Sequence, residues 1–447
     1  MKFGGTSVGR PERMHQVKDL ITRGDEPTIV VLSALSGTTN ALVGIGEALA
    51  AGNKSLAKER IDKLHAHYLA FYPALLQTAE ARGKAEEIIK EHFEFLNILL
   101  KISFNEAINR DILAQGELLS TKLFYTLLGE LQIPAVFLPA LDFMSIDENS
   151  EPELPKISEK LKAILAQYPN ERLFITQGYI CKNHRNEVDN LKRGGSDYTA
   201  SLVAAAINAS VCEIWTDIDG MHNNDPRHVQ NTYPIRKVSF REAAELAYFG
   251  AKILHPTCVI PAENADIPIR LKNTFTPDRS GTLISRETSG HLVTAMAAKD
   301  NITAIRIRSG RMLNAFGFLR RVFEVFEKHH TSIDMITTSE VSVSLTIDDK
   351  SKLNHIITDI SPFGEIQVED DFSIISIVGD NIAKAEKLLP GIFEVLEGIP
   401  IRMVSLGGSP NTISILVPST DKVDSLQKLD RILFHTHPLT QQKTNIQ

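Results

Sequence analysis

The sequence predicts an α/β protein in which a mostly parallel sheet lies between helices and two smaller modules follow. Continuous apolar runs such as 28–33 and 173–180 are typical of buried parallel strands, and helical segments separate them. Beyond residue 283 the segments become shorter, and 341–347 alternates apolar and polar residues as a half-buried antiparallel strand does. We therefore expect one large domain over 1–283 and a differently built C-terminal region.

Length, composition and charge indicate an ordinary globular protein with several domains. The 447 residues suffice for two to four domains of about 150 residues each. The net charge of −7 and the lack of a long basic run argue against nucleic acid or a membrane surface as a partner. Cys181, Cys212 and Cys258 lack the spacing of metal ligands, which indicates reduced thiols and a cytoplasmic location. Neither a signal peptide nor an apolar run long enough to span a membrane is recognised.

The first two strand ends carry groups suited to a phosphate or a small substrate. Lys2 stands directly before Phe3-Gly4-Gly5, so a mobile positive charge adjoins backbone donors that a ligand can approach closely. No Walker A motif occurs in the chain. The run 28–33 ends at Ser33, and Thr39 follows; ligands of open α/β sheets bind at such strand ends. The alternatives are a flexible N-terminus and a helix capped by Thr39 or Asn40.

A glycine-rich turn before an alanine-rich helix is the strongest single signal in the chain. Arg193-Gly194-Gly195-Ser196-Asp197 precedes this helix. Glycines let the backbone approach a ligand, a helix N-terminus attracts anions, and Arg193 can hold a carboxylate through two hydrogen bonds. The alternative is a polar turn in which Asp197 only caps the helix. Upstream, Glu117 follows a glycine, and we expect it to begin a helix; such a glutamate is by itself more typical of a solvated first turn.

Three later segments offer further polar groups to a ligand at the same sheet. The apolar strand 211–217 ends in Thr216 and Asp217, and Arg227 lies in the turn that follows. Lys252 lies on an amphipathic helix, from which it either reaches solvent or meets a phosphate. The short strand 267–271 then closes the α/β part.

The C-terminal region contains two copies of a βαββαβ pattern, the order of a ferredoxin-like module. The first copy is expected over 300–369 and the second over 370–440. The second copy lacks one strand, and the spare strand 292–298 could supply it, which would insert the first module into the second. Neither copy contains a catalytic triad or a metal-type cluster, so we interpret both as binding or regulatory modules.

Six motifs, in this order, resemble those of the aspartate kinases (aspartokinases) of the amino-acid kinase superfamily, in their monofunctional form. The resemblance covers nearly the whole chain and rests on Lys2-Phe3-Gly4-Gly5-Thr6-Ser7-Val8, Leu32-Ser33-Ala34, Gln115-Gly116-Glu117, Arg193-Gly194-Gly195-Ser196-Asp197-Tyr198-Thr199, Trp215-Thr216-Asp217 and Phe249-Gly250-Ala251-Lys252. The resemblance implies the amino-acid kinase fold with two C-terminal ACT modules. It implies an ATP-dependent phosphotransferase that makes 4-phospho-L-aspartate from L-aspartate, at the start of lysine, threonine and methionine biosynthesis.

The resemblance also implies roles for single residues. Lys2 and Asp197 match the catalytic pair, in which Lys2 stabilises the transferring phosphoryl group and Asp197 orients Lys2. The substrate contacts implied are Ser33, Thr39, Glu117, Arg193, Gly194, Gly195 and Ser196. The ATP contacts implied are Lys2, Phe3, Gly4, Gly5, Thr216, Asp217, His222, Arg227, Lys252 and Ile253. Mg²⁺ is expected to be bound through phosphates and water, with no dedicated metal site in the protein.

An effector site is expected in the first C-terminal module, with L-lysine as the inhibitor. The residues implied are Met312, Ala315, Gly317, Phe318, Leu319, Ser332, Ile333 and Asp334. Gly317 would open a helix whose free N–H groups suit a carboxylate, and Asp334 would take an ammonium group; a plain turn and a solvated strand-edge charge are the alternatives. A homodimer or homotetramer formed through these modules is expected. Two rival functions stay open, a kinase of the same fold for another acidic amino acid and a non-catalytic amino-acid sensor.

Overall fold

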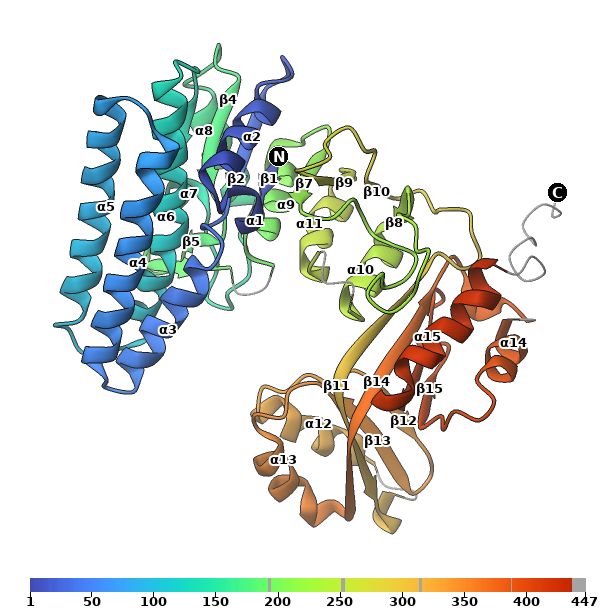
Figure 1. The fold of residues 1–447 in the computed structure, drawn as a ribbon. Helices are drawn as coiled ribbons and strands as arrows, with labels where there is room; N and C mark the ends of the chain where they lie inside the picture. The colour runs from blue at the N-terminus through green and yellow to red at the C-terminus, as the bar shows by residue number, and fades with distance from the viewer. Residues whose placement is uncertain (192–193, 251–253, 313–315, 387, 436–447) are drawn as a thin grey trace. The chain divides into compact units, whose positions relative to one another are not determined.

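The computed structural model of the chain describes all residues except 192–193, 251–253, 313–315, 387 and 436–447. The chain forms two compact units, the first from residues 1–221 and 253–287 and the second from 222–252 and 288–447 (Figure 1). The sequence predicted one catalytic domain over 1–283. In the structure, residues 222–252 of that range belong by their contacts to the second unit. Among the described residues no helix is long and apolar enough to cross a membrane, and the cytoplasmic location stays a prediction.

A mostly parallel sheet forms the centre of the first unit, as the apolar runs predict. Its strands follow the order β3-β4-β2-β1-β7-β9-β10. In the described part of this unit β10 runs antiparallel to β9, and all the other neighbouring strands in this order are parallel. The strands are β1 (Lys2–Phe3), β2 (Thr28–Leu32), β3 (Val136–Leu138), β4 (Leu173–Gln177), β7 (Cys212–Thr216), β9 (Ile269–Asn273) and β10 (Thr282–Ser285). Lys2 pairs with Val31 on one side and Ile214 on the other, so the carboxyl ends of β1, β2 and β7 meet at one edge.

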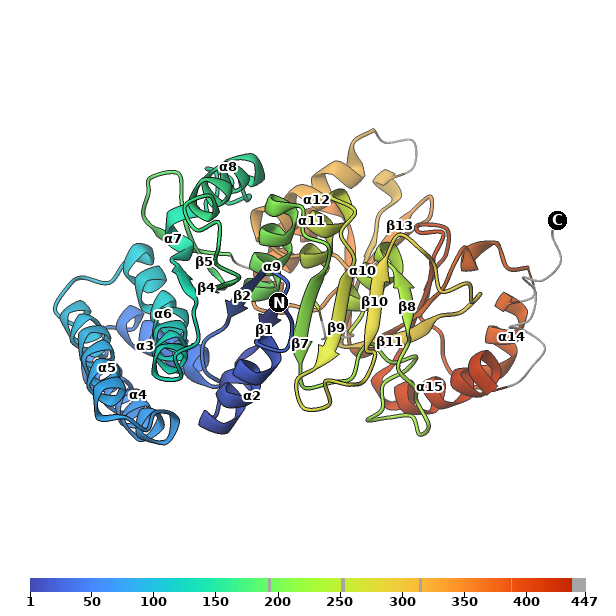
Figure 2. The same ribbon diagram turned by 90° about the horizontal axis from the view of Figure 1, so that it is seen from above.

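Helices cover both faces of this sheet (Figures 1 and 2). Ile175 packs into a core with the long helices, whereas its neighbour Phe174 packs into a second core on the opposite face, as the two-residue period of a strand requires. Asn53, Thr78 and Asn105 cap three of the long helices through their side chains. The helices are α1 (Gly5–Val8), α2 (Pro11–Ile21), α3 (Thr38–Ala50), α4 (Lys54–Leu75), α5 (Ala79–Leu99), α6 (Glu106–Glu130), α7 (Ala140–Phe143), α8 (Leu154–Leu165), α9 (Gly195–Ile207) and α11 (Val259–Asn264), and β5 (Ile180–Lys182) and β6 (Val188–Asn190) form a hairpin.

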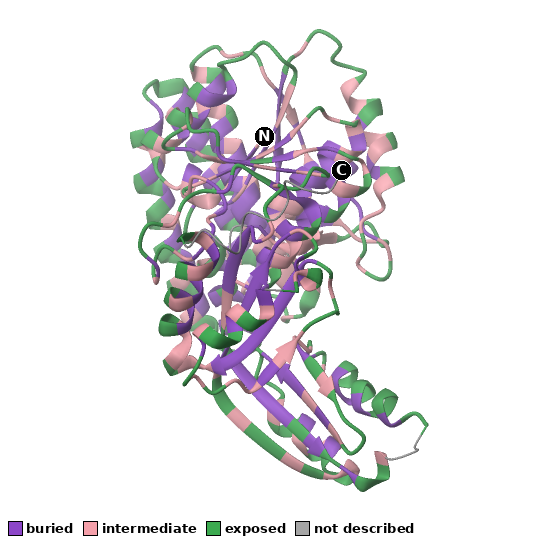
Figure 3. Ribbon diagram, turned by 90° about the vertical axis from the view of Figure 1, so that its right-hand side faces the viewer, coloured by how far each residue is buried: buried purple, intermediate pink, exposed green. Residues whose placement is uncertain are grey.

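The second unit is built on an antiparallel sheet with the order β12-β13-β11-β14-β16-β15. Its strands are β11 (Ala295–Arg308), β12 (Ile336–Thr338), β13 (Ser342–Ile347), β14 (Glu365–Val378), β15 (Met403–Ser405) and β16 (Thr412–Pro418). Its helices are α10 (Phe240–Tyr248), which follows the short strand β8 (Lys237–Ser239), α12 (Phe318–Lys328), α13 (Leu353–Ile360), α14 (Leu388–Val395) and α15 (Lys422–Asp430). In both units the helices carry buried residues along one side and exposed residues along the other (Figure 3).

Two strands of this sheet are longer than the sequence pattern predicts. The predicted strands 292–298 and 302–308 are joined in β11, and 365–368 and 372–378 are joined in β14. The first part of β11, Ala295–Lys299, pairs with the last part of β14, and the second part of β11 pairs with the first part of β14. The polar residues between the predicted strands cause only two local shifts of register, after Lys299 and after Ile302, not an interruption.

Candidate active site

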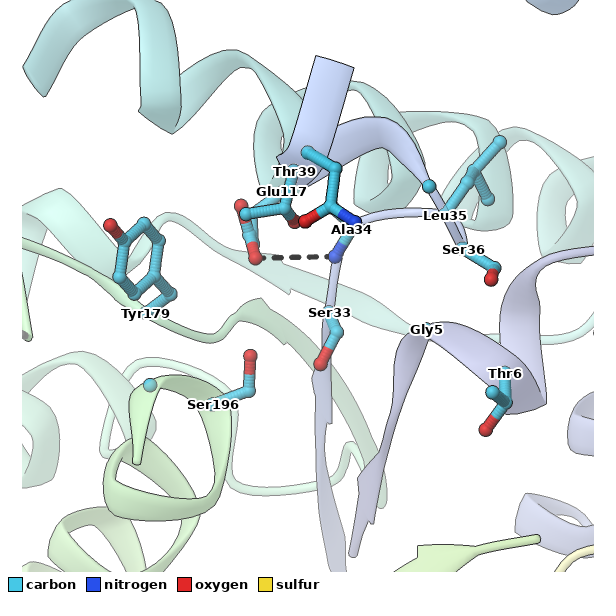
Figure 4. A pocket seen from close by; sticks show the side chains of 13 residues that line it. Gly5, Thr6, Ser33, Ala34, Leu35, Ser36, Thr39, Glu117, Tyr179 and Ser196 are labelled. Atoms are coloured by element: carbon cyan, nitrogen blue, oxygen red, sulfur yellow. Dashed lines mark hydrogen bonds between the residues drawn. The ribbon is translucent and has the colours of Figure 1, made fainter. Parts of the chain in front are cut away.

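A cavity of about 430 Å³ opens at the carboxyl ends of β1 and β2 (Figure 4). It is lined by Gly5, Thr6, Ser33, Ala34, Leu35, Ser36, Gly37, Thr39, Asn40, Glu117, Tyr179, Gly195 and Ser196. Six of these residues were predicted to contact substrate or ATP from the sequence: Gly5, Ser33, Thr39, Glu117, Gly195 and Ser196. The cavity therefore joins α1, the loop between β2 and α3, α6 and α9, which lie far apart in the chain.

The predicted catalytic pair forms an ion pair. Lys2 Nζ, on β1, lies 2.7 Å from Asp197 Oδ1, in the first turn of α9. The two side chains are only 11% and 18% exposed. A Cβ atom on Gly4 would lie 3.3 Å from Lys2 Nζ, so the glycine leaves room for the ammonium group. The same pair contradicts the alternative in which Asp197 only caps a helix.

Glu117 lies in the middle of α6, not at the start of a helix as the sequence indicated. Its side chain is buried, and Oε1 accepts a hydrogen bond of 3.3 Å from the Ala34 N–H (Figure 4). Oε2 has no hydrogen-bond partner among the described residues. Burial raises the pKa of the Glu117 carboxyl from 4.5 to about 7, against the opposing effects of the hydrogen bond from the Ala34 N–H and of the nearby Lys2 charge. The solvated alternative for Glu117 is therefore wrong, and the free oxygen is available to a cationic group.

The glycine turn before α9 has the backbone conformation that only glycine adopts easily. Gly194 caps α9 with a φ of 77°, and a Cβ atom there would lie 2.4 Å from Cys258 Sγ. A Cβ atom on Gly178, at the end of β4, would lie 2.3 Å from Ser196 Oγ. Gly178 therefore leaves room for Ser196 at the cavity wall, and Gly194 leaves room for Cys258.

Ser33 and Thr39 occupy the positions that the strand-end argument predicts. The backbone of Ser33 is fixed on both sides, because its N–H donates to the Phe3 carbonyl and its carbonyl accepts a bond from Ser120 Oγ at 2.8 Å. Thr39 lies in the first turn of α3, whose N-terminal cap is Gly37 without any side-chain bond. The alternative in which Thr39 or Asn40 caps this helix is therefore wrong.

The residues implied for ATP fall in both units. Phe3 stacks on Trp215 with 5.7 Å between ring centroids, and Thr216, at the end of β7, donates to Asp217 at 3.2 Å. His222 and Arg227 belong to the second unit, where His222 Nδ1 lies 3.0 Å from Thr232 Oγ1. Arg193, Lys252, Ile253 and Ala315, which the sequence also singled out, lie outside the described residues.

Comparison with known proteins decides the family. The model of the amino acid kinase family matches residues 1–273, and the ACT domain model matches 305–354 and 375–433. Lysine-sensitive aspartokinase 3 of Escherichia coli is 34% identical over 445 residues, covering 97% of this chain and 98% of the relative. The chain belongs to the aspartokinase family. Aspartokinase 2 of Arabidopsis thaliana, a chloroplastic enzyme, is 34% identical over 98% of this chain and 84% of its own length.

Solved aspartokinase structures have the same fold over nearly the whole chain. Aspartokinase III of E. coli in complex with aspartate and ADP, in its R state, matches with a TM-score of 0.85 and 34% identity, covering 97% of this chain and 99% of that chain. The same enzyme in complex with lysine and aspartate, in its T state, matches with a TM-score of 0.81 and covers 97% and 98%. The predicted amino-acid kinase fold with C-terminal ACT domains is thus confirmed.

Sequence reasoning missed one prominent residue in the cavity of this aspartokinase. Tyr179 lines the cavity (Figure 4) and has a left-handed backbone with a φ of 67°. Its N–H donates to Thr199 Oγ1 at 2.9 Å, which stabilises this uncommon conformation. Burial raises the pKa of the Tyr179 phenol to about 12, so the ring stays neutral. Only its place directly after Gly178, at a strand end, could have indicated it.

The residues expected at the aspartokinase effector site lie in the second unit. Gly317, with a φ of 77°, precedes α12, so it opens a helix as expected; Phe318 is buried and Leu319 is exposed. Asp334 is fully buried at its side chain, with Oδ1 2.5 Å from Lys299 Nζ and 3.0 Å from the Tyr248 hydroxyl. The alternative of a solvated charge at Asp334 is therefore wrong. Burial raises the pKa of Asp334 despite these partners.

Proposed function

We propose that the chain transfers the terminal phosphoryl group of ATP to the side-chain carboxylate of L-aspartate, giving ADP and 4-phospho-L-aspartate. This reaction opens the biosynthesis of lysine, threonine and methionine. The observation that carries the proposal is the buried Glu117 carboxylate with a free oxygen, in the same unit as the Lys2–Asp197 ion pair. The solved structure of a relative, E. coli aspartokinase III with aspartate and ADP, also supports the proposal.

The substrate is held by opposite charges at its two ends. Glu117 Oε2, which has no partner in the described part of the chain, takes the ammonium group of aspartate. Arg193 takes a carboxylate by two hydrogen bonds, as its fork of donors allows. The uncharged contacts come from Ser33, Thr39, Gly194, Gly195 and Ser196. A cavity of about 430 Å³ is at the small end of the range for ligand pockets, which suits an amino acid.

The chemistry requires positioning and charge neutralisation more than proton transfer. The attacking carboxylate of aspartate is already ionised at neutral pH, so no general base is needed. Lys2 neutralises charge that develops on the transferring phosphoryl group, and Asp197 keeps the ammonium in place. ATP is expected to contact Phe3, Gly4, Gly5, Thr216, Asp217, His222, Arg227, Lys252 and Ile253. Mg²⁺ is proposed to be held mostly by phosphate oxygens and water, as this ion usually is in kinases.

Regulation is assigned to two ACT modules, over 300–369 and 370–440, with strand 292–298 contributed to the second. L-lysine is the proposed inhibitor, bound by residues of 312–319 together with Ser332, Ile333 and Asp334. The E. coli relative whose structure contains lysine and aspartate supports this choice. A homodimer or homotetramer that joins through these modules would connect effector binding to the distant active site as a difference in affinity between two states.

The test is an assay of ADP release by the purified full chain with ATP and Mg²⁺. Aspartate should support turnover, glutamate and acetylglutamate should not, and lysine rather than threonine should inhibit. Turnover with glutamate alone would favour a kinase for another acidic amino acid, and no turnover with any of these would favour a non-catalytic sensor. Arg193→Ala should raise the KM for aspartate while the affinity for ATP alone stays unchanged.

A further inference from the structure

A series of hydrogen bonds in the second unit, with one step through the backbone of Asp225, leads from helix α15 to Arg227. Asp430 Oδ1 accepts a bond of 3.0 Å from Asn224 Nδ2. Asn224 Oδ1 in turn accepts a bond of 2.9 Å from the Asp225 N–H. The Asp225 carboxylate accepts three bonds from the Arg227 guanidinium, of 2.9 and 3.2 Å from Nε and of 2.6 Å from Nη2. The bond from the Asp225 N–H fixes the backbone from which the carboxylate that holds Arg227 projects.

The Asp430 end of this series of hydrogen bonds is buried, and its Arg227 end is exposed. Asp430 and Asn224 are 4% and 3% exposed, and a carboxylate and an amide buried to this degree need bonded partners. His435 Nε2, 2.9 Å away, lies against the other oxygen of Asp430. The Arg227 side chain, by contrast, is 72% exposed, so packing does little to orient it. Its direction depends on Asp225, and through Asp225 on the buried pair.

A second set of contacts holds the same turn to α15. Gln427 Nε2 donates to the His228 carbonyl at 3.1 Å, and Lys422 Nζ lies 3.3 Å from His228 Nε2. Gln427 and Asp430 are three residues apart and therefore lie on one face of the helix. This face of α15 thus contacts residues on both sides of Arg227. Helix α15 lies within the second stretch matched by the ACT domain model, 375–433.

We propose that Asp430 is a positioning residue for ATP binding, acting through Asn224 and Asp225 on Arg227. The inference rests on the proposed function, in which Arg227 contacts the nucleotide. A guanidinium held in one direction before the ligand arrives loses less conformational freedom on binding, which increases affinity. The second ACT module then contributes to the affinity for ATP even when no effector is present, and it acts on ATP and not on aspartate.

The test compares Asp430→Ala with Asp430→Asn in the full chain. Asp430→Ala removes the acceptor for Asn224 and should raise the KM for ATP about tenfold while the KM for aspartate stays unchanged. Asp430→Asn keeps an acceptor oxygen and should restore a KM for ATP close to that of the wild type. Asp424→Ala is the matched control, because Asp424 lies on the same helix in an exposed ion pair with Lys428. It should leave both KM values unchanged.

Three outcomes would overturn the positioning role. They are an unchanged KM for ATP in Asp430→Ala, an equal rise in both KM values, or the same change in Asp424→Ala. Asn224→Ala removes the donor of the hydrogen bond to Asp430. It must reproduce the selective rise in the KM for ATP even if Asp430→Ala does not fold. Arg227→Ala separates the two proposals. If it leaves the KM for ATP unchanged, the nucleotide contact itself is wrong; if it raises that KM and Asp430→Ala does not, only the positioning role fails.

Discussion

Replacing Glu117 by glutamine is expected to change stability and substrate affinity in opposite directions. The pKa of the buried carboxyl is raised from 4.5 to about 7, so the folded protein disfavours the ionised form by about 3 kcal/mol at alkaline pH. For an acid whose pKa is raised on folding, the free energy of unfolding falls as pH rises from about 4.5 to about 7 and stays lower above it. Glutamine cannot ionise, so the Glu117→Gln variant lacks this fall in the free energy of unfolding.

The stability of the ligand-free variant, relative to wild type, should therefore increase between pH 5 and pH 8. The increase should amount to about 2–3 kcal/mol, since most of the wild-type penalty develops in that interval. Any constant cost of burying the amide cancels in this difference. Thermal melting at pH 5, 6, 7 and 8 measures it. Glu87→Gln, at an exposed position of α5, is the matched control and should show no such trend.

Affinity should change in the other direction, because the carboxylate receives the ammonium group of aspartate. Loss of one partner of a buried charge pair costs about 2–5 kcal/mol, so the KM for aspartate should rise by about thirtyfold or more. In the wild type this KM should fall about tenfold between pH 6 and pH 8, as Glu117 ionises around pH 7. The reasoning is refuted if Glu117→Gln melts below the wild type by the same margin at every pH, or if its KM for aspartate is unaltered.

Three further predictions concern catalysis, packing and regulation. Lys2→Ala should lower kcat at least about a hundredfold with a KM for aspartate within a few fold of wild type, because its charge acts on the phosphoryl group; near-normal turnover would remove Lys2 from catalysis. Gly178→Ala places a Cβ atom 2.3 Å from Ser196 Oγ and 2.8 Å from its Cα, so it should lower stability by about 1–3 kcal/mol and raise the KM for aspartate, measured by melting and initial rates. Asp334→Asn should raise the half-inhibitory concentration of lysine at least about tenfold; a titration indistinguishable from wild type would exclude Asp334 from the effector site.

The layered α/β fold could be predicted from the sequence because its central strands are continuous apolar runs. The burial of Glu117 could not, because α6 also buries Gln115, and tertiary packing rather than local pattern decides which polar residues of a long helix face inward. The left-handed backbone of Tyr179 could not be predicted either, because a tyrosine gives no indication of a positive φ. The pairing of Lys2 with Asp197 joins residues almost two hundred positions apart, and only the family resemblance, not spacing or periodicity, predicted that the two act together.

The continuity of β11 and β14 has a consequence for how this regulatory region can evolve or be engineered. In the proposed division into modules, each strand contributes one part to the first ACT module and the other part to the second, and the two strands pair along both parts. Neither module is therefore a cassette that could be deleted, duplicated or exchanged at a linker, because any cut between the modules severs two strands in the centre of one sheet. A change of effector specificity must instead arise by substitution in place, on a sheet whose central strands belong to both modules.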